Sequence, residues 1–361
     1  MKLKIYYSAD IARLPEGVSS DSVCGIVVLG VDDSKEYHQF LLELKSSVKM
    51  LLGRKVPITL VPQPLLPDGG ISYEIYVLEG SAKISFGEKD GVCYGFVNNE
   101  EYSMLFMEGV PSSDFSADVH AQSAEVFRNV DSLLSSHGFD AGDIVRQWNY
   151  IGNITGCRNG RQNYQEFNDA RSFYYENGKW TFGYPAATGI GTSSEGITVG
   201  CIAFRRNDAG GIYPINNPLQ IAAHEYSRKV LVDNDVNALK TTPKFERAKL
   251  IETSEGACCF VSGTAAIRGE SSMDISSARL QTIQTIENIE YLVSKENLLR
   301  FGCRAYDLNM LNLRVYIKNE EDYDQVRDVV EDNYPDVPVV YTIADVCRQE
   351  LLVEIECILM S

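Results

Sequence analysis

The last apolar run of the chain, residues 351–359, contains a carboxylate residue, Glu354, between Val353 and Ile355. An apolar run of this length predicts a buried strand. A charge inside a buried strand costs free energy unless the group is paired or used in chemistry. We therefore predict that Glu354 is the catalytic group. The alternative is a strand-edge carboxylate in water, although Glu356, on the same face, could be the exposed one instead.

Hydrophobic periodicity predicts alternating strands and helices along the rest of the chain. Apolar or alternating runs predict strands, and apolar residues at three- and four-residue spacing predict helices. The predicted strands are residues 2–7, 24–31, 57–61, 72–78, 82–86, 92–97, 102–107, 144–151, 196–205, 257–267, 310–317 and 337–343. The predicted helices are residues 33–53, 118–137, 163–176, 276–296 and 319–333. From residue 72 onward, polar turns between short strands predict an antiparallel meander.

The order of these elements repeats in the second half of the chain. Residues 145–151 align with 311–317, 185–188 with 338–341, and 196–204 with 350–358, the last with one residue of slip. A repeated strand–helix–strand unit predicts an α+β fold of two similar domains side by side. The predicted parts are an N-terminal extension (1–70), a first domain (71–206), a connector (207–250) and a second domain (251–361).

The differences between the two copies point to a site. Glu354 falls opposite Gly200 in this alignment, so the second copy alone has the carboxylate. Arg171 falls opposite Val330, an apolar helix position. An Arg at such a position either extends along the surface or points into a pocket. We predict a cleft between the copies, lined by Glu354 from one and Arg171 from the other.

Composition limits the partners that the protein can have. A chain of 361 residues is long enough for two domains. The net charge of −17 argues against nucleic acid and anionic membranes, and a small anionic substrate would need a local cluster of Arg. The nine cysteines include no C-x-x-C pair and the four histidines are scattered, so we expect no metal site and reduced thiols. With no apolar run resembling a signal peptide or a membrane span, we expect a cytoplasmic protein.

The closing strand, Leu351-Leu-Val-Glu-Ile-Glu356, resembles that of the RidA/YjgF-like fold, which is also described as chorismate mutase-like. A wider set of motifs, in order from about residue 100 to the end, resembles the chorismatases, which contain two such domains as an internal repeat. That set comprises Trp148-Asn-Tyr150, Tyr164-Gln-Glu-Phe-Asn-Asp-Ala-Arg171, Pro185-Ala-Ala-Thr-Gly-Ile-Gly191, Asn217-Pro-Leu-Gln220, Phe245-Glu-Arg-Ala248 and Ser262-Gly-Thr-Ala265.

The resemblance implies a reaction. Chorismatases release pyruvate from the enolpyruvyl ether of chorismate without a metal or an organic cofactor. The acid/base Glu of their last strand matches Glu354. Protonation of the methylene carbon gives an oxocarbenium ion that water or an internal hydroxyl can attack, and a carboxylic acid supplies that proton if burial raises its pKa. Members that form 3-hydroxybenzoate have a Gly matching Gly263 and a Cys matching Cys347, so the resemblance favours a 3-hydroxybenzoate synthase.

The predicted site combines these residues with the candidates from the repeat. Glu354 and Cys347 form the predicted catalytic set, in which Cys347 is not a nucleophile. The predicted substrate-binding residues are Gly263, Arg171, Tyr164, Tyr226 and Arg206. The alternatives are that Cys347 is a small buried hydrophobe, that Gly263 only allows close backbone approach, and that both tyrosines only pack.

One departure from the family pattern affects substrate binding. Where chorismatases have an Arg suited to a substrate carboxylate, this chain has Glu225. An anion there would repel a dianionic substrate, so we expect Arg171, Arg206 or Arg268 to compensate.

Two other functions compete with a chorismatase. A RidA-like imine deaminase holds the substrate carboxylate with an Arg two residues after the Pro of its closing motif. Ala187 and Val340 occupy those positions here, which counts against this activity. A catalytically degenerate binding protein of the same fold is the other alternative. Because a two-domain chain resembles an internally fused oligomer, we expect a monomer.

Overall fold

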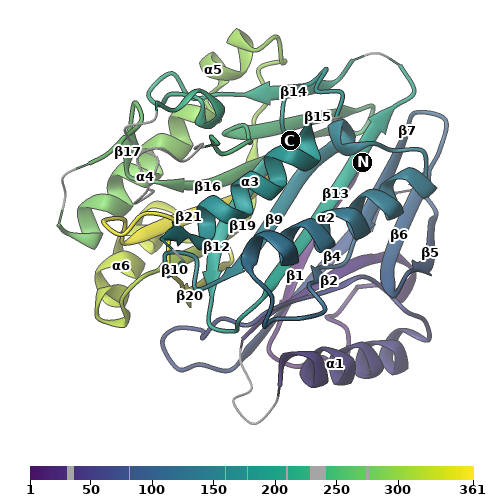
Figure 1. Ribbon diagram of the computed structural model, residues 1–361. Helices are drawn as coiled ribbons and strands as arrows, with labels where there is room; N and C mark the ends of the chain where they lie inside the picture. The colour runs from purple at the N-terminus through teal and green to yellow at the C-terminus, as the bar shows by residue number, and fades with distance from the viewer. Residues whose placement is uncertain are drawn as a thin grey trace.

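Three large β-sheets with helices on their outer faces build the protein (Figure 1), and two further sheets have two strands each among the described residues. The computed structural model describes residues 1–30, 36–80, 82–158, 160–176, 178–208, 210–227, 241–273 and 276–361. The predicted beginning of the first helix, at residues 33–35, and the end of the strand before it, at residue 31, lie outside the described residues.

The N-terminal unit is a four-stranded sheet covered by one helix. Its elements are β1 (Lys2–Ser8), β2 (Val23–Gly30), α1 (Tyr37–Leu52), β3 (Ile58–Val61) and β4 (Ile71–Glu79). The strand order is β1-β4-β2-β3. The apolar stripe of α1 packs on this sheet, and α1 ends at Gly53, which adopts the left-handed conformation that favours glycine.

The first repeat is a larger sheet covered by two helices. Its elements are β5 (Ile84–Lys89), β6 (Val92–Asn98), β7 (Tyr102–Met107), β8 (Val110–Pro111), α2 (Val119–Ser136), β9 (Ile144–Gly152), β10 (Cys157–Arg158), β11 (Arg161–Gln162), α3 (Asn163–Tyr175), β12 (Ala186–Thr192) and β13 (Ile197–Arg206). The main sheet has the order β12-β9-β13-β7-β6-β5, and β8 also pairs with β13.

The second repeat has a six-stranded sheet in the order β14-β15-β16-β21-β19-β20. Its elements are β14 (Ile212–Ile215), β15 (Ala248–Thr253), β16 (Gly256–Ala265), β17 (Ile267–Arg268), β18 (Ser271–Ser272), α4 (Ala278–Leu292), α5 (Lys295–Arg300), β19 (Asn309–Ile317), α6 (Tyr323–Asn333), β20 (Val339–Ile343) and β21 (Val353–Met360). The helix predicted for 276–296 ends earlier, at Leu292, because Ser294 caps the start of a separate helix, α5.

The same topology occurs three times along the chain. Each unit has a strand, a helix and two further strands: β2–α1–β3–β4, β9–α3–β12–β13 and β19–α6–β20–β21. In each unit the first strand pairs in parallel with the strand that follows the helix and antiparallel with the last strand. The predicted α+β fold with two similar domains is therefore confirmed, and the N-terminal part contains a third unit. The prediction that residues 72–78 open the meander is wrong, because β4 pairs with β1 and β2. The domain limits at 70, 206 and 250 remain a prediction.

A shared core lies between the inner faces of the sheets. It combines Leu3, Tyr76, Phe106, Trp148 and Ile358, which come from all three units. The helices pack on the opposite faces, where separate apolar clusters form under α1, under α2 and α3, and under α4 and α6. The inner faces thus bring residues far apart in the sequence into contact.

The strand register corrects the sequence alignment of the closing strands. Gly200 lies opposite Trp148 in the first repeat, and Glu356 lies opposite Arg314 in the second. Because Trp148 and Arg314 are equivalent in the repeat, Gly200 corresponds to Glu356. The predicted equivalence of Gly200 with Glu354 is wrong by two residues, since apolar strands of similar composition fix their register poorly in sequence.

The true counterparts of Glu354 are hydroxyl residues. Glu354 lies opposite Tyr316, and the equivalent residue Tyr150 lies opposite Thr198. In the N-terminal unit the equivalent position is Ser72. The second repeat alone therefore has a carboxylate at this position. The sequence led to the same conclusion, although it compared Glu354 with Gly200 and not with Thr198.

Candidate active site

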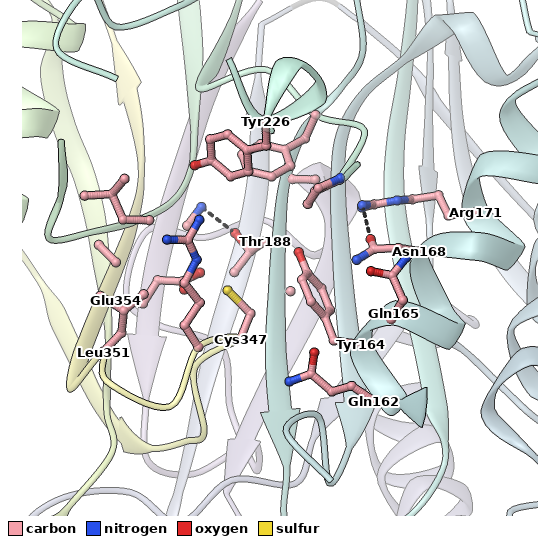
Figure 2. A pocket seen from close by; sticks show the side chains of 18 of the residues that line it. Gln162, Tyr164, Gln165, Asn168, Arg171, Thr188, Tyr226, Cys347, Leu351 and Glu354 are labelled. Atoms are coloured by element: carbon pink, nitrogen blue, oxygen red, sulfur yellow. Dashed lines mark hydrogen bonds between the residues drawn. The ribbon is translucent and has the colours of Figure 1, made fainter. Parts of the chain in front are cut away.

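A cavity lies between the two repeats, where β12 of the first meets β16 and β21 of the second. Its volume is about 820 Å³, including the space open to solvent. One wall comes from α3, the opposite wall from residues 347–354, and a third side from residues 243–247 (Figure 2). Among the described residues, no group of three or more His, Cys, Asp or Glu side chains could hold a metal ion.

Glu354 projects into this cavity because of the alternation along β21. Val353 and Ile355 face the helices of the second repeat, so Glu354 faces the first repeat. β21 pairs with β16 on one side and β19 on the other, and only 6% of Glu354 is exposed. The strand-edge alternative is therefore wrong, and Glu356 is not exposed either, at 3%.

The surroundings of Glu354 favour its neutral form. Burial, together with the neighbouring Glu356 carboxylate, raises the pKa of the Glu354 carboxyl to about 8. Arg247 and Arg146 lower this pKa, but they do not outweigh burial. At neutral pH the group is therefore an acid with a proton to donate.

Gly263 makes room for the Glu354 carboxyl. A Cβ atom built on Gly263 would overlap the Oε1 atom of Glu354 and lie 3.0 Å from the Cγ2 atom of Thr188. The register of β16 against β21 shifts between Val261 and Thr264, and this irregularity turns the Gly263 N–H toward Thr188, whose Oγ1 accepts a 3.0 Å hydrogen bond. The close approach of the Glu354 and Thr188 side chains explains why residue 263 is a glycine.

The joint between the first two units repeats this geometry without the acid. There the Gly109 N–H donates a 2.8 Å hydrogen bond to the Thr59 Oγ1. Thr198 stands at the position of Glu354, and its hydroxyl lies 3.3 Å from the hydroxyl of Tyr37. The fold therefore builds this joint without a carboxyl group at the position of Glu354, so Glu354 is an addition in the second repeat.

Three arginines line the cavity, and their hydrogen-bond partners in the described part of the chain are neutral. Arg171 donates to Asn168 Oδ1 at 2.5 Å. Arg247 donates to the Tyr226 hydroxyl at 2.5 Å, and Arg348 donates to the Glu270 carbonyl oxygen at 3.0 Å. Buried guanidinium groups without a carboxylate partner favour binding of an anion.

The arginines occupy opposite sides of the cavity. Arg171 and Asn168, one helical turn apart on α3, lie on the side away from Glu354 (Figure 2). Arg247 and Arg348 both lie within about 6 Å of the Tyr226 ring, at 5.6 and 5.3 Å from its centroid. A ligand with two separated carboxylates would match this distribution of charge.

Cys347 and Tyr164 also line the cavity, as the sequence predicted for the site. Burial raises the pKa of the Cys347 thiol to about 12, so the thiol is uncharged and unsuited to nucleophilic attack. Tyr164 packs against Gly189, where an added Cβ would lie 3.2 Å from the tyrosine ring. Burial raises the pKa of its hydroxyl as well.

Predictions about three charged residues are corrected by the fold. Arg206, at the end of β13, does not line the cavity, because its guanidinium group binds the Asp208 carboxylate at 2.5 Å and the Glu252 carbonyl oxygen at 2.8 Å. Arg268 is also outside the cavity and pairs with Glu287 at 3.0 Å. Glu225 is exposed and does not line the cavity, so the expected repulsion of an anionic substrate does not arise there.

Sequence reasoning missed Arg247, Arg348 and Thr188 as site residues. Arg247 was within a quoted motif, and Arg348 follows Cys347, but neither had a helix or strand pattern that indicated a pocket. Arg247 is held in place because Glu246, next to it, bridges to Ala186 of β12 in the other repeat. A contact between distant segments of this kind leaves no local signal.

Comparisons with known proteins agree on one family. The protein-family model "Chorismatase FkbO/Hyg5-like, N-terminal" matches residues 76–203 of this chain. A 3-hydroxybenzoate synthase of Streptomyces hygroscopicus is 31% identical over 296 residues, 80% of this chain and 81% of that protein. A chorismatase of the same organism is 31% identical over 257 residues, 70% of this chain and 71% of that protein.

A solved chorismatase structure has the same fold, with a TM-score of 0.75 and 24% identity over 99% of this chain and 98% of that one. Fold and cavity therefore define an α+β enzyme with an acid-bearing pocket between two repeats. The chain belongs to the chorismatase family. None of the helices in the described residues is long and apolar enough to cross a membrane.

Proposed function

We propose that the protein releases pyruvate from chorismate and forms 3-hydroxybenzoate, with Glu354 as the general acid. The observation that supports this most directly is the buried Glu354 carboxyl, which lies in a cavity with arginines on both sides. Two relatives of this chain are named for this substrate or this product. Chorismate has two carboxylates and an enolpyruvyl ether, so it has both features that such a cavity recognises.

Binding positions the ether against the acid. Arg171 on one side and Arg247 with Arg348 on the other would each take one carboxylate through charge-assisted hydrogen bonds. The interactions hold the enolpyruvyl group between them, beside Glu354. Fixing the reacting atoms in this way lowers the entropic part of the barrier.

The chemical step is a proton transfer to carbon. Glu354 gives its proton to the methylene carbon, the C=C electron pair forms the new C–H bond, and positive charge develops on the ether carbon and oxygen. The resulting Glu354 carboxylate stabilises this oxocarbenium ion. The ring hydroxyl of the substrate then attacks the cation, forms a cyclic ketal and returns its proton to the Glu354 carboxylate. Cleavage of the bond from this hydroxyl oxygen to the ring, with loss of the proton on the neighbouring ring carbon, makes the ring aromatic and leaves a hemiketal that collapses to pyruvate and 3-hydroxybenzoate. Attack by water would instead give a hemiketal that collapses to pyruvate and a non-aromatic diol.

Gly263 and Cys347 support 3-hydroxybenzoate as the product. In the family resemblance these two positions accompany aromatisation, and hydrolytic members have bulkier residues there. Both residues line the cavity beside Glu354. Small side chains at these positions leave room for the ring to rearrange. The atoms of chorismate are those of pyruvate plus 3-hydroxybenzoate, so this product needs no added water.

The direct test is to mix the purified protein with chorismate and measure pyruvate with lactate dehydrogenase, while chromatography identifies the aromatic product. We expect pyruvate and 3-hydroxybenzoate in equal amounts. Pyruvate with a non-aromatic diol would contradict the proposed product but not the proposed reaction. No pyruvate release by the folded protein would reject the function and leave a binding protein or an imine deaminase.

The pH dependence of the reaction follows from the raised pKa of Glu354. The carboxyl is protonated below a pH of about 8 and loses the proton as the pH rises through that value. We expect kcat to be constant near pH 7 and to fall by about tenfold per pH unit well above pH 8. A profile of kcat from pH 6 to 10 checks this, and a rate that rises through pH 8 would contradict an acid role.

Replacing Gly263 with Ala should displace the catalytic carboxyl. The new Cβ would occupy the place of the Glu354 Oε1 atom, and the backbone of Gly263 has no positive φ that would add strain. We expect kcat to fall by at least about tenfold, with a smaller share of 3-hydroxybenzoate among the products. Gly210→Ala is the matched control, because a Cβ there meets nothing within 4 Å. Unchanged rate and product in Gly263→Ala would contradict this account of the glycine.

A further inference from the structure

A buried cluster of charges lies behind Glu354 on the inner faces of the sheets. Arg314 donates to both carboxylates of the cluster, at 2.5 Å to Glu74 Oε2 and at 2.9 Å to Glu356 Oε1. Arg146 donates to Glu356 Oε2. All four residues are at most 3% exposed. The cluster therefore contains two cations and two anions that neutralise each other away from water.

Each structural unit contributes to this cluster. Arg146 comes from β9 in the first repeat, Arg314 and Glu356 come from the second repeat, and Glu74 comes from β4 in the N-terminal unit. Glu74 and Glu356 occupy equivalent places, since they lie opposite the equivalent residues Val27 and Arg314. The N-terminal unit therefore supplies one of the two anions that pair with Arg314.

The cluster meets the active site at Glu356. Glu354 and Glu356 lie two residues apart on the same face of β21. Thr188 connects the two regions, because its hydroxyl binds Glu356 and Arg146 and also accepts the Gly263 N–H. Cluster and catalytic carboxyl are thus held at one joint between the repeats.

The other charged or titratable groups near Glu354 are Arg146 of the cluster and four residues that line the cavity. These four are Arg247 before β15, Cys347 and Arg348 after β20, and Tyr164 on α3. Arg247 and Arg348 line the cavity, and the Cys347 and Tyr164 groups are neutral because burial raises both pKa values. Glu356 is the anion next to Glu354, and Arg146 and Arg314 hold the pKa of Glu356 below its ordinary value despite burial.

We propose that Glu356 is a positioning residue that keeps Glu354 protonated, and that the N-terminal unit supports this through Glu74. Arg146 and Arg314 are neutralised by Glu74 and Glu356, so the cluster offers no spare positive charge to a third carboxylate. Glu354 is that third carboxyl group and retains its proton beside an existing anion. The proposal rests on the proposed role of Glu354 as an acid, and it gives the N-terminal unit a part in catalysis without contact with substrate.

The test is an infrared titration of the protonated carboxyl of Glu354, identified by the loss of its band in Glu354→Gln. Glu356→Gln removes an anion and leaves a net positive cluster, so the titration midpoint should fall by about one pH unit or more. Glu74→Gln should lower the titration midpoint of Glu354 as well, but by less, because Glu74 acts through Arg314. Glu356→Asp keeps the charge and should restore most of the midpoint.

The matched control is Glu108→Gln, which removes another buried carboxylate that is paired with Lys45 at 2.8 Å outside the cavity. Its midpoint should equal that of the unaltered protein. An unchanged midpoint in folded Glu356→Gln overturns the role of Glu356. If Glu356→Gln does not fold, an unchanged midpoint in Glu74→Gln overturns the proposal. The titration needs no substrate, so its outcome does not depend on whether the protein acts on chorismate. Absence of pyruvate release would reject the proposed function but would not change the titration midpoints.

Discussion

Glu354→Gln is expected to lower kcat for pyruvate release from chorismate by about a thousandfold, the size of effect that a general acid contributes. The amide has nearly the same shape as the carboxylic acid but has no proton to give to the methylene carbon. Since Arg171, Arg247 and Arg348 remain, KM should change little. Steady-state kinetics with coupled pyruvate detection measure both constants.

The same substitution should leave the protein as stable as before or more stable. A folded carboxyl with a raised pKa binds a proton that the unfolded chain releases above a pH of about 4.3. The contribution of Glu354 to stability is therefore complete below that pH and declines as the pH rises through about 8. Thermal unfolding at pH 6 and pH 9 should show that Glu354→Gln loses less stability between these two pH values than the unaltered protein.

Full activity of Glu354→Gln on chorismate would reject the proposed mechanism.

Arg247→Met is expected to raise KM for chorismate by about 100-fold. A hydrogen bond to a charged group contributes up to about 3 kcal/mol, and a buried substrate carboxylate would lose its counter-charge. Arg247 lies beside Tyr226 and is only 3% exposed, so Met fills much of its volume without the charge. Initial rates over a range of chorismate concentrations measure this change.

The control for this prediction is Arg206→Met. Arg206 carries the same charge and lies at the end of β13, but it pairs with Asp208 outside the cavity. Its KM should match that of the unaltered protein. Equal effects of the two substitutions would mean that overall charge, and not a specific contact, attracts the substrate. An unchanged KM in Arg247→Met would remove this Arg from the binding site.

Local patterns were sufficient for most of the elements and for singling out Glu354, which lies in the cavity. The periodicity of residues 351–359 predicted β21, and the carboxylate within it stood out because a buried strand does not tolerate an unused charge. The repeated order of elements predicted two similar units and a cleft that contains both Glu354 and Arg171. These inferences succeed because burial and alternation are properties of a few neighbouring residues.

Other features depended on how distant strands meet. The sequence alone favoured Gly200 as the counterpart of Glu354, and only the pairing of β9 with β13 and of β19 with β21 gave the correct register. Arg206 and Arg247 are both arginines near a strand end, yet one faces Asp208 and the other faces the cavity. Sequence spacing does not distinguish these cases, because the direction of each side chain depends on partners more than 20 residues away for Arg247.

The sequence by itself determined the class of fold, the internal repeat and the unusual carboxyl of Glu354, since each follows from residue type and periodicity. The tertiary structure alone decided which arginines face the cavity and that Gly263 makes room for Glu354. It also decided that Glu74, which the sequence placed in the first domain without a predicted role, joins the charge cluster behind Glu354. The physical reason is that charge balance and steric fit at a buried site are set by groups that meet only when three sheets pack together.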